Sequence, residues 1–122
     1  MNNNLTTKLM EALQVAQKNA ASGGRAQIYP AELLLALVEQ EGGVLASVLN
    51  KAGVELAALA RALQDNLNRK PHQTGAVAQS PGIGPELDRC LNAAEEQRKR
   101  MKDDYLSVEH IVLGMLEADN EL

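Results

Sequence analysis

The chain has 122 residues, which is the size of one domain with a single hydrophobic core. Its net charge of -4 argues against broad attraction to nucleic acid phosphates or to an anionic membrane surface, so neither is expected as a main partner. The apolar 45% of the chain is mostly Leu and Ala, while Phe and Trp are absent, and this balance favours an all-α fold packed through aliphatic side chains.

Targeting and redox signals are sparse. Cys90 is the single cysteine, so no disulfide can form within the chain. No apolar run approaches the roughly 20 residues of a membrane-spanning helix. The N-terminus shows no charged segment followed by an apolar one, as a secretory leader would. The sequence therefore predicts a cytoplasmic protein.

Apolar residues at three- and four-residue spacing predict four helices in the first half of the chain, over residues 5–21, 30–40, 44–51 and 55–68. The stretch "KPHQTGAVAQSPGIGP" then breaks every periodicity with glycine and proline, which predicts a linker over residues 70–84 that ends in a turn at "GIGP". A fifth helix is expected from Pro85 to about Met101. A sixth should follow Ser107, a good N-cap residue.

A constant offset of 78 residues superposes the two halves of the pattern. It places Leu9 on Leu87, Leu33 on Ile111 and Ala36 on Gly114. The offset predicts a pseudo-twofold duplicated helical repeat within one domain, with a first repeat over residues 1–69 and a partial second repeat over residues 85–122. Leu122 falls on Val44, so we expect the second repeat to be truncated and its helices to expose apolar side chains.

The adjacent residues Glu109 and His110 raise the alternative of a reaction centre. A general acid and base would need a third group to orient them, but His72 and Cys90 are remote in sequence and give no spacing typical of catalysis or of a metal site. The offset sets the pair against Ala31 and Glu32, at another helix start. The preferred interpretation is therefore a helix opening, in which His110 is structural and Glu109 offers an exposed carboxylate to a partner.

Several stretches of the chain, taken in order, resemble the sequence pattern of a known family. The ordered elements "IYPAELLLALVEQEGG", "LNKAGV", "LNRKP" and "YLSVEHIVLGMLE" are similar to the double Clp repeat at the N-terminus of Clp-class AAA+ unfoldases, and most similar to its ClpB-like disaggregase branch. The resemblance implies a helical domain tethered to a homohexameric ATPase ring that binds unfolded or aggregated client proteins. It also implies a client-contact surface that matches Thr6, Asp103 and Glu109 here.

Two departures limit what the resemblance implies. The chain lacks a GxxxxGK[ST] motif, so we expect no cofactor and no catalysis in this chain, while ATP and magnesium are implied for the full-length parent. In the ClpC-type domains of the family, both repeats carry a Glu-His pair that can accept a modified arginine on a client, and here Ala31 replaces the first Glu. The alternative is an N-domain of the ClpA or ClpC type, which docks an adaptor protein. A third alternative is an independent enzyme, and the evidence for it in the sequence is limited to Glu109 and His110.

Overall fold

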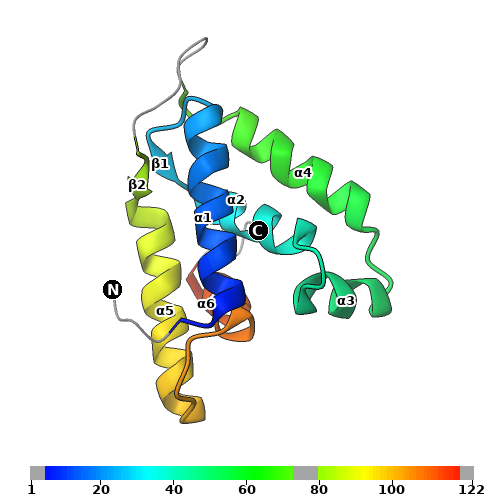
Figure 1. Ribbon diagram of the computed structural model, residues 1–122, viewed down its shortest axis with the longest axis vertical. Coiled ribbons are helices and arrows are strands. Elements are labelled where there is room, and N and C mark those ends of the chain that lie inside the picture. The colour runs from blue at the N-terminus through cyan, green and yellow to red at the C-terminus, as the bar shows by residue number, and fades with distance from the viewer. Residues whose placement is uncertain (1–4, 73–79, 119–122) are drawn as a thin grey trace.

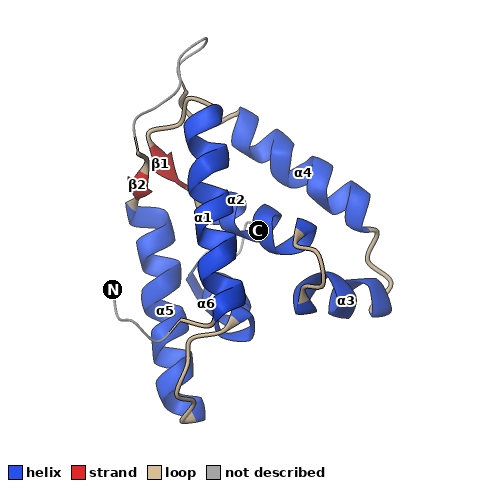
Figure 2. Cartoon of the chain, in the orientation of Figure 1, coloured by secondary structure: helices blue, strands red, loops and turns tan. Residues whose placement is uncertain are grey.

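The computed structural model describes residues 5–72 and 80–118, and within these residues it contains six helices and one small sheet (Figures 1 and 2). In chain order these are α1 (Thr7–Ser22), β1 (Gln27–Ile28), α2 (Pro30–Glu39), α3 (Val44–Lys51), α4 (Leu56–Asn68), β2 (Gly82–Ile83), α5 (Pro85–Met101) and α6 (Val108–Ala118). The predicted all-α fold class is confirmed. Within the described ranges, no helix has the length and apolar character that crossing a membrane requires.

The first helix begins two residues later than the apolar pattern predicts. Thr6 has an extended backbone, and its hydroxyl accepts a hydrogen bond from the N–H of Leu9 at 3.3 Å, as an N-cap residue does. Leu5 lies outside the helix and forms a parallel β-bridge with Leu106. Sequence periodicity could not separate these roles, because Leu5 keeps the apolar spacing of the helix while its backbone pairs elsewhere.

Residues 70–84 were predicted to be irregular throughout, and this prediction is wrong for the last residues of the segment. Gly82 and Ile83 form β2, which pairs in parallel with Gln27 and Ile28 of β1. The first two residues of "GIGP", where a turn was expected, are therefore a strand, and Pro85 already begins α5. A strand of two residues shows no alternation in sequence, and its partner lies far away along the chain, so only the tertiary fold specifies it. Residues 73–79 of the predicted linker lie outside the described residues.

The pseudo-twofold relation is visible in the backbone pairing. One contact joins Leu5 to Leu106 and the other joins Ile28 to Ile83. The offset of 78 residues converts position 5 to 83 and position 28 to 106, so the two contacts join the same pair of positions with the repeats exchanged. Figure 1 shows the resulting arrangement, with β2 leading into α5 beside β1.

The same pseudo-twofold relation extends to the C-terminal ends of α1 and α5. Gly24 and its counterpart Lys102 both adopt the left-handed backbone region, with φ of 73° and 57°. The next residue in each copy, Arg25 or Asp103, donates its N–H to a carbonyl of the preceding helix at 2.9 or 3.2 Å. Both helices therefore end in the same turn, even though only one copy uses glycine.

The hydrophobic core joins equivalent positions of the two repeats, because Leu9, Leu87, Leu33 and Ile111 are all fully buried. The surfaces of α2 and α6 differ, however. The helices α3 and α4 pack on α2, whereas no equivalent pair covers α6 within the described residues. Leu35 and Val38 of α2 are consequently buried, while their counterparts Leu113 and Leu116 are 39% and 63% exposed. The expected exposure of apolar side chains on the sixth helix is confirmed.

Candidate functional site

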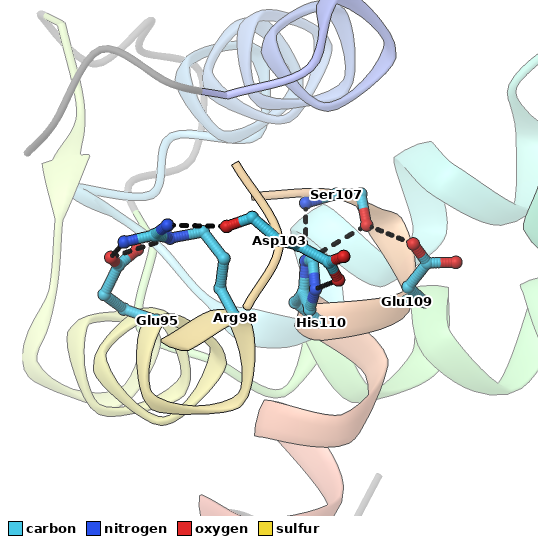
Figure 3. A network of polar contacts seen from close by, with 6 residues as sticks. All are labelled: Glu95, Arg98, Asp103, Ser107, Glu109 and His110. Atoms are coloured by element: carbon cyan, nitrogen blue, oxygen red, sulfur yellow. Dashed lines mark hydrogen bonds and ion pairs between the residues drawn. The ribbon is translucent and has the colours of Figure 1, made fainter. Parts of the chain in front are cut away.

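A network of side chains surrounds the start of α6 (Figure 3). The Ser107 carbonyl accepts the first bond of the helix, from the N–H of Ile111 at 3.2 Å, which makes Ser107 the N-cap residue. Nδ1 of His110 accepts a hydrogen bond from the Ser107 N–H at 2.9 Å. His110 thus takes the place that a glutamate or glutamine holds in a capping box. The predicted structural role of His110 is confirmed.

The hydrogen bonds of His110 determine which ring nitrogen carries its proton. Nδ1 accepts from a backbone amide, so in the neutral ring the proton is assigned to Nε2. Nε2 lies 2.8 Å from Oδ2 of Asp103 and donates to it. The His110 side chain is 1% exposed, while that of Asp103 is 43% exposed. The buried ring therefore anchors a carboxylate whose other face meets solvent.

Asp103, His110 and Ser107 form a sequence of contacts like that of a hydrolase triad, because the Ser107 hydroxyl lies 3.1 Å from Nδ1 of His110. The arrangement does not suit catalysis. The lone pair of Nδ1 already accepts from the backbone N–H of Ser107, and the Ser107 hydroxyl donates to Oε1 of Glu109 at 2.7 Å. The geometry therefore favours the helix-cap interpretation over a reaction centre.

The loop before α6 is held by a second group of contacts. The guanidinium of Arg98 donates to the backbone carbonyl of Asp103 at 2.8 Å and forms an ion pair with Glu95 (Figure 3). Arg98 lies in the last turn of α5, where a cation also favours the negative end of the helix dipole. Arg98 thus holds the backbone of Asp103, while His110 holds its side chain.

The structure places all three predicted site residues around the segment that contains Leu106 and Ser107. The backbone N–H of Thr6 donates to the carbonyl of Leu106 at 3.0 Å. Glu109 contacts Ser107, and Asp103 contacts His110. Their proposed role in client contact remains a prediction, but the three lie on one continuous network of bonds at the junction of α1 and α6.

Exposed apolar side chains accompany these polar groups. Tyr105, directly before Leu106, is 60% exposed, and Met10, one turn after Thr6, is 43% exposed. Large apolar groups on a surface are more informative when polar groups of fixed position adjoin them. This end of the molecule therefore presents carboxylates and apolar side chains together.

An apolar groove of about 280 Å³ lies where the two repeats meet. It is lined by Leu34, Leu45, Leu49, Val54, Leu59, Val112, Met115 and Leu116. Leu34 and Val112 are counterparts in the two repeats, which places the groove between α2 and α6. On α6, Glu109 precedes Val112 and Leu116 at three- and seven-residue spacing, so the carboxylate shares a helix face with the groove.

A second polar pair, which the sequence interpretation missed, occupies the equivalent place in the first repeat. Nε of Arg25 donates to Oε1 of Glu32 at 2.9 Å, and both side chains are buried. The offset sets Arg25 against Asp103 and Glu32 against His110, so each repeat carries one pair with the basic and acidic members exchanged. Comparing charged residues as well as apolar ones at this offset would have found the pair.

The environment of Glu32 opposes its charge. Burial raises the pKa of the Glu32 carboxyl above its ordinary value, and the hydrogen bond and charge of Arg25 lower it in part. The pair therefore joins α2 to the end of α1 at an electrostatic cost. The desolvation of both charges offsets much of their mutual attraction, and the pair adds little net stability.

The remaining candidates for chemistry are structural or exposed. Cys90 is fully buried, as predicted. His72 is exposed, and its Nδ1 lies 2.9 Å from the carbonyl oxygen of Lys70. Across residues 5–72 and 80–118, no three His, Cys, Asp or Glu side chains gather in a way that could hold a metal ion.

Replacing His110 with phenylalanine tests the cap assignment. The slightly larger His110→Phe ring still fills the buried site but leaves the Ser107 N–H and the Asp103 carboxylate without their partner. We expect the free energy of unfolding, measured with urea, to fall by about 2–3 kcal/mol. The matched control is His72→Phe, at an exposed histidine, which should change it by less than about 0.5 kcal/mol. Equal effects of the two substitutions would contradict the assignment.

Comparison with known proteins places this geometry in context. The family model of the Clp repeat (R) N-terminal domain matches residues 4–122. The chaperone protein ClpB of Mycobacterium tuberculosis (strain ATCC 25618 / H37Rv) is 35% identical over 119 residues. That match covers 98% of this chain but 14% of the relative, so the chain spans about one seventh of the length of such relatives.

Solved structures share the fold. The Hsp104 N-terminal domain from Candida albicans matches with a TM-score of 0.81 at 20% identity, over 97% of this chain and 77% of that chain. A ClpV N-domain in complex with a VipB peptide matches with a TM-score of 0.78 at 19% identity, over 96% of this chain and 70% of that chain.

Proposed function

We propose a client-binding function for this chain, which belongs to the Clp repeat (R) N-terminal domain family. In this proposal the chain is the N-terminal, non-catalytic domain of a ClpB-like disaggregase, and it binds unfolded or aggregated client proteins. Thr6, Asp103 and Glu109 form the client-contact surface. The similarity to chaperone protein ClpB supports the proposal that the full-length parent is a ClpB-like protein.

The observation that carries the proposal is the position of Glu109 on the groove face of α6. The Ser107 hydroxyl holds one oxygen of Glu109, and the exposed carboxylate lies in line with Val112 and Leu116. A groove with an anionic end suits a segment of unfolded chain that carries apolar residues followed by a basic one. A binding site of this kind is tolerant of sequence, because apolar contact is non-directional.

The energy source of such a parent lies outside this chain. The sequence of this chain has no GxxxxGK[ST] motif, the loop that holds the phosphates of ATP in P-loop ATPases. ATP and magnesium would serve a homohexameric ring of AAA+ segments in the full-length protein. The part proposed for this chain is capture and release of clients, for which weak binding is appropriate.

Titration of a fluorescently labelled, permanently unfolded client tests the assignment. The double variant Asp103→Asn, Glu109→Gln removes two charges, and each new side chain keeps an oxygen that can accept the bond from His110 or Ser107. We expect the dissociation constant to rise about fivefold, as two partly exposed charges would allow. The control Asp65→Asn, Glu96→Gln makes the same two kinds of substitution at exposed residues that do not line the groove. An equal loss of affinity in both variants would contradict the site.

Adaptor docking is the second candidate, and one observation favours it. A solved ClpV N-domain with this fold is in complex with a VipB peptide. A folded adaptor would give one stoichiometric band in a pull-down from lysate, whereas client capture would give a broad set of unfolded proteins. Repeating the pull-down with Leu116→Asp shows which of the two uses the groove.

A further inference from the structure

A polar cavity of about 450 Å³ lies away from the candidate client surface. It forms where the C-terminal ends of α1 and α4 approach α2, at the end of α1 opposite Thr6 (Figure 1). Asn19 of α1, together with Gln64 and Asn68 of α4, contributes side-chain amides to its wall. Leu35 is the one apolar side chain among its lining residues, so the cavity does not suit an apolar ligand.

The charges around the cavity are predominantly negative. Glu32 and Glu39 of α2 both line it, and Arg25 is the single cation among the lining residues. The Arg25 guanidinium is committed to the protein, because it donates to Glu32 at 2.9 Å and to the Asn19 carbonyl at 3.4 Å. This leaves the exposed carboxylate of Glu39 without a matching positive charge in the lining.

Two helix ends also contribute to the charge around the cavity. A helix C-terminus carries partial negative charge on its free carbonyl groups, and basic side chains in the last turn usually offset it. Neither α1 nor α4 has a basic residue in its last turn, but Arg25 donates to the Asn19 carbonyl of α1 and Arg69 is the C-cap residue of α4. Lys70, just after α4, pairs with Glu86 at 3.8 Å and is not part of the lining. The C-terminal ends of both helices border the cavity, and because cations lie at both ends, the exposed carboxylate of Glu39 is the main negative group there.

The second repeat provides an internal comparison. At the equivalent end of α5, the last turn contains Arg98, Lys99 and Arg100. The polar pair beside it is Asp103 and His110, of which only His110 is buried, in place of Arg25 and Glu32. No counterpart of α4 closes that side within the described residues. The negative cavity is thus a property of the first repeat, and duplication alone does not account for it.

We propose that this cavity binds the cationic side chain, lysine or arginine, of a polypeptide. Glu39 supplies the charge that pairs with the cation, and the amide oxygens of the lining accept its N–H groups. The positive end of the ligand then meets two helix C-termini. An anion would meet the exposed carboxylate of Glu39, and the Arg25 guanidinium is already paired with Glu32, so the lining favours a cation over an anion. The site is separate from the groove on α6 and does not depend on it.

Chemical-shift titration of the ¹⁵N-labelled chain tests this site with small probes. N-acetyl-arginine methylamide and N-acetyl-lysine methylamide are each expected to shift the backbone amides of Gly23, Gln64 and Asn68 in a saturable manner. The neutral isostere N-acetyl-citrulline methylamide should give no saturable shift. The difference between the two cationic probes shows whether a guanidinium or an ammonium fits better, and either outcome supports the proposal.

The variant Glu39→Gln should weaken binding of the better probe at least fivefold. Glu39 is exposed near the end of α2, so the substitution leaves the core intact, and the same spectra verify the fold. The control Glu11→Gln removes an exposed charge on α1 and should leave affinity unchanged. The proposal is overturned if citrulline binds as well as arginine, if Glu39→Gln has no effect, or if the shifts map only to α6. Shifts at α6 alone would leave the client site standing, so the two proposals fail separately.

Discussion

Replacing Arg25 with methionine is expected to lower the free energy of unfolding by about 3–5 kcal/mol, the largest effect that we predict for any substitution in this chain. The substitution leaves the Glu32 carboxylate buried, at 1% side-chain exposure, with no cation beside it. It also removes the donor that contacts the end of α1 at the Asn19 carbonyl. Chemical denaturation followed by circular dichroism measures the change.

The size of this loss should not be read as the net contribution of the ion pair. The double variant Arg25→Met, Glu32→Leu removes both charges and fills the space with apolar groups, so we expect it to recover most of the stability lost in Arg25→Met. Arg61→Met, at an exposed arginine of α4, is the matched control and should cost less than about 0.5 kcal/mol. If Arg25→Met cost no more than Arg61→Met, the pair would have no structural role.

The pH dependence of the pair has a definite sign. Burial raises the pKa of Glu32 in the folded state, so the folded chain holds this proton more tightly than the unfolded chain does. The stability that Glu32 contributes is therefore fully present below its unfolded pKa, about pH 4, and is lost as the pH rises through the raised folded value. Relative to the double variant, the wild type should lose stability over that interval, as urea unfolding at a series of pH values would show.

Replacing Gly114 with alanine is expected to lower the free energy of unfolding by about 2–3 kcal/mol, although alanine favours a helix over glycine by about 1 kcal/mol. A Cβ atom at this position would lie 2.6 Å from the backbone nitrogen of Ala94 and 2.6 Å from the carbonyl oxygen of Cys90. These are backbone atoms of α5, so the contact can be relieved only if α5 and α6 separate.

The first repeat again supplies the control. Ala36 is the counterpart of Gly114 on α2 and is buried against the core. Ala36→Gly should cost about 1 kcal/mol, which reflects helix propensity and a lost methyl group. The two substitutions exchange the same pair of residues in opposite directions, and thermal unfolding compares them directly. A neutral or stabilising Gly114→Ala would show that the α5 and α6 crossing can loosen without cost.

The proposed client site was predictable only in part from the sequence. The resemblance of "KDDYLSVEH" to a known family pointed to Asp103 and Glu109, and the structure brings them to one segment with Thr6. The sequence did not show that His110 binds Asp103, because a contact over seven residues crosses a turn whose geometry depends on Lys102 in the left-handed region. The Asp103 carboxylate is consequently a structural group as well as a candidate contact.

What the sequence determined by itself is the set of helices and their duplication. Helix periodicity and capping residues are local, so Pro30, Ser107 and the spacing of leucines were enough to place the six helices to within two or three residues. The offset of 78 residues works because equivalent positions pack in equivalent ways, as the fully buried Leu33 and Ile111 show.

Only the tertiary structure decided how the two repeats differ. The strands pair across more than fifty residues and have no local signal. Arg25 pairs with Glu32 in the buried interior, whereas Asp103 of the equivalent pair with His110 reaches solvent. The helix α4 covers α2, while α6 presents Leu113 and Leu116. Such differences depend on which side chains meet across the fold, and apolar periodicity cannot report them because it records only which face of each helix is buried.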